Sequence, residues 1–207
     1  MKVLPWCAAP AACVIALVAG TASADELISN LPGNDGSQSA SLQTGRIKAM
    51  GFTMPAGLDY FLDSADLRLN ITGLGVDPLI RIFDDVGGLP TNELVELVDP
   101  PIGATGIETY SFTTPGPFVL EAGKTYWVVA YNIGADSIDW KASSPSQTPT
   151  GLATHAGSLF STTTGPLPPT GTSSILCSYA IQGTAVPAPG ALALAGLGGL
   201  LAARRRR

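Results

Sequence analysis

The sequence has few of the residues on which most enzymes and metal sites depend. It holds one histidine, His155, and three cysteines among 207 residues. Two of these cysteines, Cys7 and Cys13, lie near the amino terminus, so Cys177 stands alone in the rest of the chain. One histidine and one cysteine cannot supply the three or four ligands of a usual zinc site. A single cysteine also excludes an intrachain disulfide in that part of the chain.

Charged residues are scarce as well, at 13% of the chain, and they are unevenly distributed. Five of the eleven basic residues lie at the two ends, as Lys2 and the run 204–207. Residues 25–185 contain six basic and all sixteen acidic residues, so 6 − 16 gives this body a net charge of −10. An acidic body repels phosphate backbones, and we therefore expect no nucleic-acid partner.

Residues 1–24 have the pattern of a secretory signal peptide. Lys2 is followed by an uncharged apolar stretch, and the segment ends with the small residues Ala22 and Ala24 directly before Asp25. Small residues at these two positions fit the narrow pocket of a signal peptidase. The apolar centre is too short to span a bilayer as a permanent helix. We predict a signal helix that signal peptidase removes, so that the mature chain begins at Asp25.

Residues 186–207 have the pattern of a second sorting segment, with three parts in a fixed order. A rigid, proline-containing stretch is open to a processing enzyme, a short apolar helix follows, and an arginine run resists translocation. The 18 residues of 186–203 would form a helix of about 27 Å, marginal for a hydrocarbon core of about 30 Å. The predicted sorting motif is Val186, Pro187, Ala188, Pro189 and Gly190, and the stop-transfer run is Arg204, Arg205, Arg206 and Arg207.

This segment resembles the PEP-CTERM sorting signal of Gram-negative bacteria. The proline pair, the Leu/Ala/Gly segment and the terminal arginine run match, whereas Ala188 replaces the glutamate of the Val-Pro-Glu-Pro motif. The resemblance implies a membrane-anchored precursor that is handed to an exosortase-like enzyme. It also implies a final place on the cell surface or in the extracellular matrix. A plain C-terminal tail anchor is the alternative interpretation.

The body between these segments has the composition and periodicity of an all-β protein. The whole chain contains 24 glycines and 17 prolines, about a fifth of its residues, and this content disfavours long helices. Residues 125–133 are apolar on both faces, as in a central strand. We expect residues 25–185 to form an antiparallel β-sandwich of jelly-roll-like type. Elsewhere apolar residues occupy alternate positions: Leu67, Leu69 and Ile71; Ile80 and Ile82; Tyr110 and Phe112; and Ile175, Cys177, Tyr179 and Ile181.

Several stretches of residues 46–183 follow one another in a recognisable order. The most specific is the Ala-Gly-Lys-Thr-Tyr-Trp-Val run at 122–128, and the others are 51–53, 62–69 and 80–90. This order resembles the bacterial family called choice-of-anchor R. The resemblance implies a β-sandwich displayed outside the cell, without an established activity.

The sequence offers no clear catalytic set. His155 lies in a Gly/Ser/Thr-rich stretch without a Gly-x-Ser-x-Gly motif, so we expect a surface or strand-edge histidine. Cys177 alternates with apolar residues, which indicates a buried, unreactive thiol. A glycosidase would need two facing carboxylates, and spacing alone pairs none of them. The candidates, all in or beside predicted turns, are Asp84, Asp85, Glu93, Asp99, Asp136 and Asp139.

Two binding sites are nevertheless candidates. Asp77, Asp84 and Asp85 flank one predicted strand, and loop carboxylates can hold a structural calcium ion, the one cofactor that we consider. Trp140, with Tyr131 as a second ring, is the candidate for stacking on a sugar, because charged residues flank it. Trp127, in contrast, is expected in the core.

The leading hypothesis is therefore an exported, non-enzymatic protein of the cell surface or extracellular matrix. Its expected partners are signal peptidase, an exosortase-like enzyme and, through the C-terminal segment, the membrane. The alternative function is a carbohydrate-binding module for exopolysaccharide.

Overall fold

The computed structural model describes residues 24–43, 45–161 and 169–187, and all of their regular structure is β-strand. The compact unit runs from Ser23 to Val186. The predicted signal helix and the predicted apolar helix lie outside the described residues. The strands are β1 (Asp25–Ser29), β2 (Ser39–Leu42), β3 (Ile47–Thr53), β4 (Tyr60–Ile71), β5 (Pro78–Asp85), β6 (Pro90–Glu96), β7 (Gly106–Thr113), β8 (Val119–Leu120), β9 (Thr125–Asn132), β10 (Ile138–Lys141), β11 (Thr150–Gly151), β12 (Thr154–Ser161), β13 (Gly171–Thr172) and β14 (Tyr179–Ala185).

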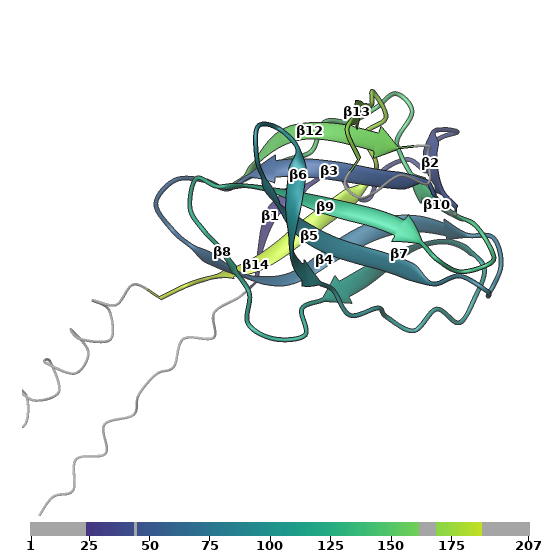
Figure 1. The fold of residues 1–207 in the computed structure, drawn as a ribbon, viewed down its shortest axis with the longest axis horizontal. Coiled ribbons are helices and arrows are strands. Elements are labelled where there is room, and N and C mark those ends of the chain that lie inside the picture. Colours follow the sequence, from purple (N-terminus) through teal and green to yellow (C-terminus); the bar gives the residue numbers. More distant parts are fainter. Residues whose placement is uncertain (1–23, 44, 162–168, 188–207) are drawn as a thin grey trace, which may run out of the picture. The chain divides into compact units, whose positions relative to one another are not determined.

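These strands form two antiparallel sheets, which Figure 1 shows as two layers. Sheet A has the order β11-β1-β14-β4-β10-β2, and β7 and β8 also pair with β4. Sheet B has the order β13-β12-β3-β9-β5-β6. The predicted all-β sandwich is confirmed for the described residues.

Strand β4 organises sheet A because it is long enough to hold four neighbours. Its residues from Tyr60 to Leu67 pair with β14, and those from Leu69 to Ile71 pair with β10. On the opposite edge, β8 pairs with the first two residues and β7 pairs with residues 64–71. From Ala65 to Ile71, buried and partly buried residues alternate strictly. This alternation fixes the register there, since a one-residue slip would turn the apolar side chains towards solvent.

The main core lies between the two sheets. Leu67, Leu69 and Ile71 of β4 are buried in it, as are Ile80 and Ile82 of β5. The alternation predicted for these strands is therefore confirmed. The same holds for Tyr110 and Phe112 of β7 and for Cys177, Tyr179 and Ile181 near the carboxyl end of the body, with Ile175 partly buried beside them.

A second apolar cluster covers the other face of sheet B, and Trp127 is its largest member. The Trp127 side chain is 2% exposed, and its Nε1 donates a hydrogen bond of 2.7 Å to Asp85 Oδ1. Its ring lies over Gly51, where a Cβ atom would come within 2.8 Å of Cζ3. Strand β9 is therefore buried on both faces, as its sequence predicts.

Candidate functional site

Trp140 lies in the core, and the prediction that it is exposed to a sugar is wrong. The side chain is 0% exposed, and Nε1 donates a hydrogen bond of 2.9 Å to the Ser178 carbonyl. The cause is the position of β10, which pairs with β2 and β4 on its two edges. Asp139 and Lys141 point away from the core on alternate positions, so the charged neighbours say nothing about the face that Trp140 occupies. A fully buried ring cannot stack on a glycan.

Tyr131 lies in the other sheet and makes no joint surface with Trp140. It stands on β9 of sheet B, half-buried against the second apolar cluster. The Arg81 guanidinium carbon lies 5.2 Å from the centre of its ring, a cation–π distance. One face of the ring is thus already occupied by a side chain of the protein.

The three aspartates predicted for calcium do not come together. Asp77 precedes β5, and Asp84 and Asp85 end it, so the length of the strand separates them by about 23 Å. At the carboxyl end of the strand, Asp84 accepts hydrogen bonds from the Asn92 backbone and side chain, and Asp85 accepts one from Trp127. Within 24–43, 45–161 and 169–187, no group of three or more His, Cys, Asp or Glu residues is placed to hold a metal ion.

His155 and Cys177 lie where the sequence predicts. His155 is half-buried on β12, at a stretch that pairs with β3 but not with the short β13. Burial lowers the pKa of its imidazole, the nearby Lys48 charge adds to that effect, and a backbone hydrogen bond with Gly51 opposes it. Cys177 is 0% exposed, and burial raises the pKa of its thiol to about 12. A neutral, enclosed thiol is a poor nucleophile at neutral pH.

The six candidate carboxylates are spread over the body. One of them, Asp99, has its pKa raised to about 6, first by burial and then by the negative charges of Asp77 and Glu96. The other five have hydrogen-bond partners within the fold: Asp84 with Asn92, Asp85 with Trp127, Glu93 with Arg81, Asp136 with the Gly75 amide and Asp139 with Asn70.

A pocket that the sequence did not predict lies where the two sheets meet at β2 and β13. Its volume is about 350 Å³. Sheet A contributes β2, and sheet B contributes β3, β12 and β13. The pocket combines an exposed cation, an exposed aromatic ring, three aliphatic side chains and several hydroxyl groups. The lining residues are Ala40, Ser41, Arg46, Ile47, Lys48, Phe160, Ser161, Thr172, Ser173, Ser174 and Ile175.

Two residues of this pocket could have been noticed in the sequence. Arg46 is one of only six basic residues in the body, and Phe160 is the large apolar residue of a Gly/Ser/Thr-rich stretch. Nothing in the spacing relates them, because 114 positions separate them along the chain. The antiparallel pairing of β3 with β12 brings them together, with Phe160 opposite Lys48.

The predicted sorting segments are only partly within the described residues. Asp25, the predicted first residue of the mature chain, is the first residue of β1, and Ala24 directly precedes it. At the other end, the Val186 amide donates a hydrogen bond of 2.9 Å to the Asp59 carbonyl. Outside the described residues lie Ala22, Ala188, Pro189, Gly190, Arg204, Arg205, Arg206 and Arg207.

Comparisons with known proteins identify no relative of this chain. No protein-family model matches the chain. No curated protein and no solved structure matches it either. In the part of the chain that the structure describes, no helix is both long enough and apolar enough to cross a bilayer.

Proposed function

We propose that this chain is an exported, non-enzymatic protein of the cell surface or extracellular matrix. Signal peptidase removes residues 1–24, which form the signal helix of the precursor. Residues 186–207 form a PEP-CTERM-like segment that holds the precursor in the membrane through its short apolar helix and is presented to an exosortase-like enzyme. The β-sandwich of residues 25–185 is the part that reaches the outside.

The placement of the two ends of the sandwich is the observation that carries this proposal. Strands β1 and β14 are antiparallel neighbours, and Asp25 pairs with Gly183. Chain entry and chain exit therefore lie at the same end of the body. A domain attached in this way can be tethered at one end while its opposite end faces outwards. The pairing of β3 with β9 joins Thr53 to Thr125 near the tethered end and Lys48 to Ala130 near the other.

The state of the reactive groups supports a non-enzymatic role. The Cys177 thiol is enclosed, with a pKa of about 12, and the single imidazole has its pKa lowered by burial. Five of the six candidate carboxylates are engaged in hydrogen bonds that hold turns, strands or Trp127 in place. These five carboxylates thus have structural roles within the fold.

Cell fractionation tests the proposal directly. The full chain is compared with a chain that ends at Ala185 and with one in which Arg204–Arg207 are replaced by glutamine. We expect the full chain in the envelope or matrix with Asp25 as its first residue, and the shortened chain in the medium. The glutamine variant keeps the length of the tail and is expected to lose membrane retention. Recovery of unprocessed protein, beginning with Met1, from the cytosol would overturn the proposal.

Carbohydrate binding is the second candidate function, and a specific observation favours it. Phe160 is 41% exposed at the pocket that Arg46 also lines. An exposed ring beside polar groups is the usual composition of a sugar site. The site differs from the one predicted in the sequence, since neither Trp140 nor Tyr131 belongs to it.

A further inference from the structure

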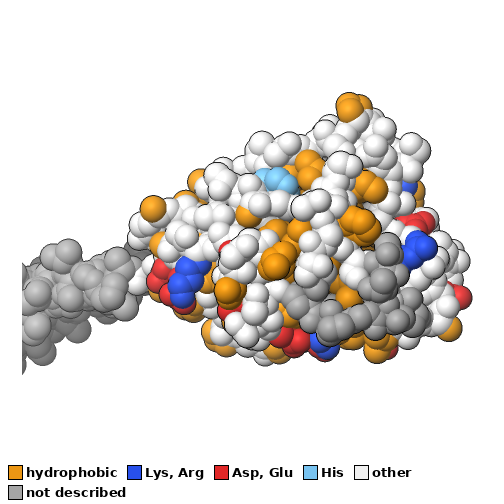
Figure 2. All heavy atoms as spheres, turned by 45° about the horizontal axis from the view of Figure 1, so that its top comes forward, with side chains coloured by type: hydrophobic (Ala, Val, Ile, Leu, Met, Phe, Trp, Pro, Cys, Tyr) orange, Lys and Arg blue, Asp and Glu red, His pale blue; other side chains and the backbone are white. Residues whose placement is uncertain are grey.

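Among the described residues, Arg46 is the one basic side chain for which no acceptor is found in the same part of the chain. It is exposed and lies directly before β3, and no described carboxylate forms a salt bridge with it. Figure 2 shows how few basic side chains the face in view carries, most of them beside acidic ones. The other five basic residues of the body all have acceptors within it. Arg68 pairs with Asp35, Arg81 with Glu93 and Glu96, and Lys124 with Glu121. Lys141 donates to the Gly36 carbonyl, and Lys48 donates to three neutral groups.

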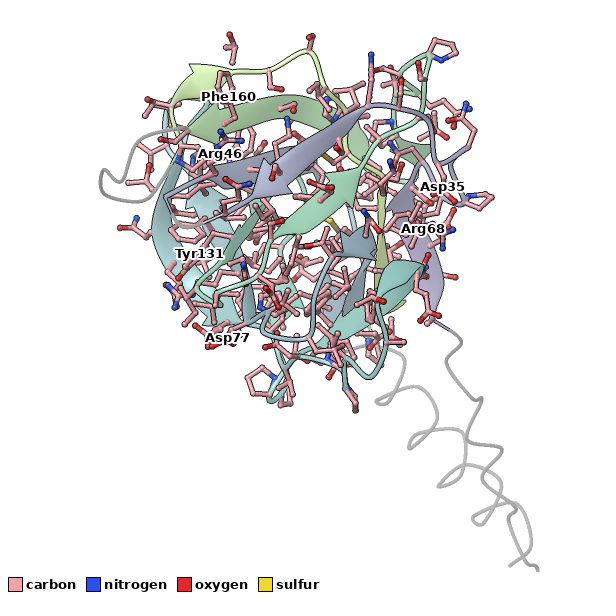
Figure 3. All side chains as sticks on the ribbon, turned by 90° about the vertical axis from the view of Figure 1, so that its right-hand side faces the viewer. Asp35, Arg46, Arg68, Asp77, Tyr131 and Phe160 are labelled. Atoms are coloured by element: carbon pink, nitrogen blue, oxygen red, sulfur yellow. The ribbon has the colours of Figure 1, made fainter. Side chains whose placement is uncertain are left out.

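Phe160 supplies an aromatic surface beside this cation. The two residues line the same pocket, and Figure 3 shows both on one side of the molecule. The ring rests against Gly171 of β13, where a Cβ atom would lie 3.4 Å from Cε1 and 2.9 Å from the Phe160 carbonyl oxygen. Glycine at this position therefore lets the neighbouring strand come close to the ring and support it.

Lys48 gives the pocket a fixed floor. Its side chain is 1% exposed, and Nζ donates hydrogen bonds to Ser158 Oγ at 2.6 Å, Ser173 Oγ at 2.7 Å and the Ile175 carbonyl at 2.7 Å. These three acceptors take all the donors of an ammonium group. Lys48 is therefore not available to a ligand. Its role is to tie the segment after β13 to β3 and β12, which holds the pocket in one shape.

We propose that this pocket binds a single carboxylated sugar, a uronic acid unit of a polysaccharide. The Arg46 guanidinium can pair with a carboxylate through two parallel hydrogen bonds. The Phe160 ring offers a flat apolar surface for the C–H face of a pyranose ring. The hydroxyls of Ser41, Thr172 and Ser174 lie on the same lining and can exchange hydrogen bonds with sugar hydroxyls.

The charge of the body limits the ligand to one with few negative groups. Residues 25–185 contain ten more acidic than basic residues, and the pocket offers one unpaired cation. A densely charged chain, such as a polyuronate or a nucleic acid, would gain one attraction at Arg46 and meet repulsion elsewhere. A polymer with occasional uronic acids among neutral sugars avoids that penalty. The pocket would then select a uronic acid unit by both its carboxylate and its pyranose ring.

Titration of the purified full-length chain, kept in a polyoxyethylene detergent, tests this proposal. The probes are methyl glucuronide and methyl glucoside, which differ by one carboxylate, and binding is measured by calorimetry. We expect the glucuronide to bind about tenfold more tightly. Arg46→Gln should remove this preference, and Phe160→Ala should weaken both probes. The charge control is Lys124→Gln, a side chain 57% exposed near the other end of β9, which should keep the preference.

Several outcomes would overturn the proposal. Equal affinity for the two probes, no heat with either probe, or an unchanged preference in Arg46→Gln would each do so. Arg46→Lys serves as a second variant, because it keeps the charge and loses the planar fork, and an intermediate preference is expected. The idea that an exopolysaccharide supplies the sugar rests on the proposed export of the chain. Sugar binding by the purified chain does not depend on export. Fractionation and titration can therefore fail independently.

Discussion

At the scale of single residues, Gly51 determines how the largest side chain of the second apolar cluster packs. A Cβ atom there would lie 2.8 Å from Trp127 Cζ3 and 2.9 Å from Cε3, closer than carbon atoms approach. Because Trp127 is also held at Asp85, its ring cannot move away freely. We expect Gly51→Ala to lower the free energy of unfolding by about 1–3 kcal/mol, the usual cost of overpacking.

The measurement is thermal unfolding followed by circular dichroism. For a domain of this size, a loss of 1 kcal/mol lowers the melting temperature by about 2–4 °C. Gly103→Ala is the matched control, since a Cβ atom at Gly103 meets no other atom within 4 Å. We expect this control to melt at or slightly above the wild-type temperature. Equal melting of the two variants would show that the Trp127 ring gives way at little cost.

At the scale of elements, Lys48 holds the segment that follows β13 against sheet B. We expect Lys48→Met to lower the free energy of unfolding by about 1–3 kcal/mol, because three charged hydrogen bonds disappear while the desolvation cost of the ammonium is relieved. Hydrogen exchange should quicken most at the Ile175 and Ser178 amides. The first donates to Ser173 Oγ at 3.2 Å, and the second donates to the Lys141 carbonyl at 2.7 Å.

Lys141→Met is the matched control for this prediction. Lys141 is half-buried, and its Nζ donates one hydrogen bond, of 2.9 Å, to the Gly36 carbonyl. We expect faster exchange near Gly36 in the control, and no change in the segment after β13. If exchange in that segment were the same in Lys48→Met as in the wild type, Lys48 would not be its tether.

Strands were predictable from the sequence where their two faces differ clearly. In β4 and β7, apolar and polar residues alternate, and the alternation matches the burial of Leu67, Leu69, Tyr110 and Phe112. Strand β12 escaped prediction because Gly, Ser and Thr dominate it, and such residues carry little polarity signal. Its place is set by pairing with β3, more than 100 positions away.

The candidate site was less predictable than the fold, for a related reason. Trp140 has charged neighbours on both sides, which led to the prediction that it is exposed. A strand turns adjacent residues to opposite faces, so charged neighbours do not indicate exposure of the residue between them. The pocket at Arg46 and Phe160 depends on strands of both sheets and on the segment after β13. No local sequence pattern indicates that these distant segments lie side by side, and their proximity is visible only in the folded sandwich.

At the scale of the whole molecule, the surplus of acidic residues makes the free energy of unfolding depend on pH. The dependence arises where several carboxylates lie close together. Asp99 follows β6 and lies near Asp77 and Glu96. Its pKa is raised to about 6, first by partial burial of a side chain that stays in contact with solvent and then by these two charges. An unfolded aspartate has a pKa near 3.8. Between about pH 4 and pH 6, the folded protein therefore holds a proton that the unfolded chain releases, so stability falls as the pH rises.

Asp99→Asn should remove this dependence. We expect the urea midpoint of the wild type to fall, relative to that of Asp99→Asn, as the pH rises from 4 to above 6, with no further relative change at higher pH. Glu96→Gln removes one of the neighbouring charges and should move the decline to lower pH, because less repulsion then opposes ionisation of Asp99. Parallel curves for the wild type and Asp99→Asn would mean that Asp99 ionises equally in both states. The pH dependence would then have to come from other groups of the acidic body.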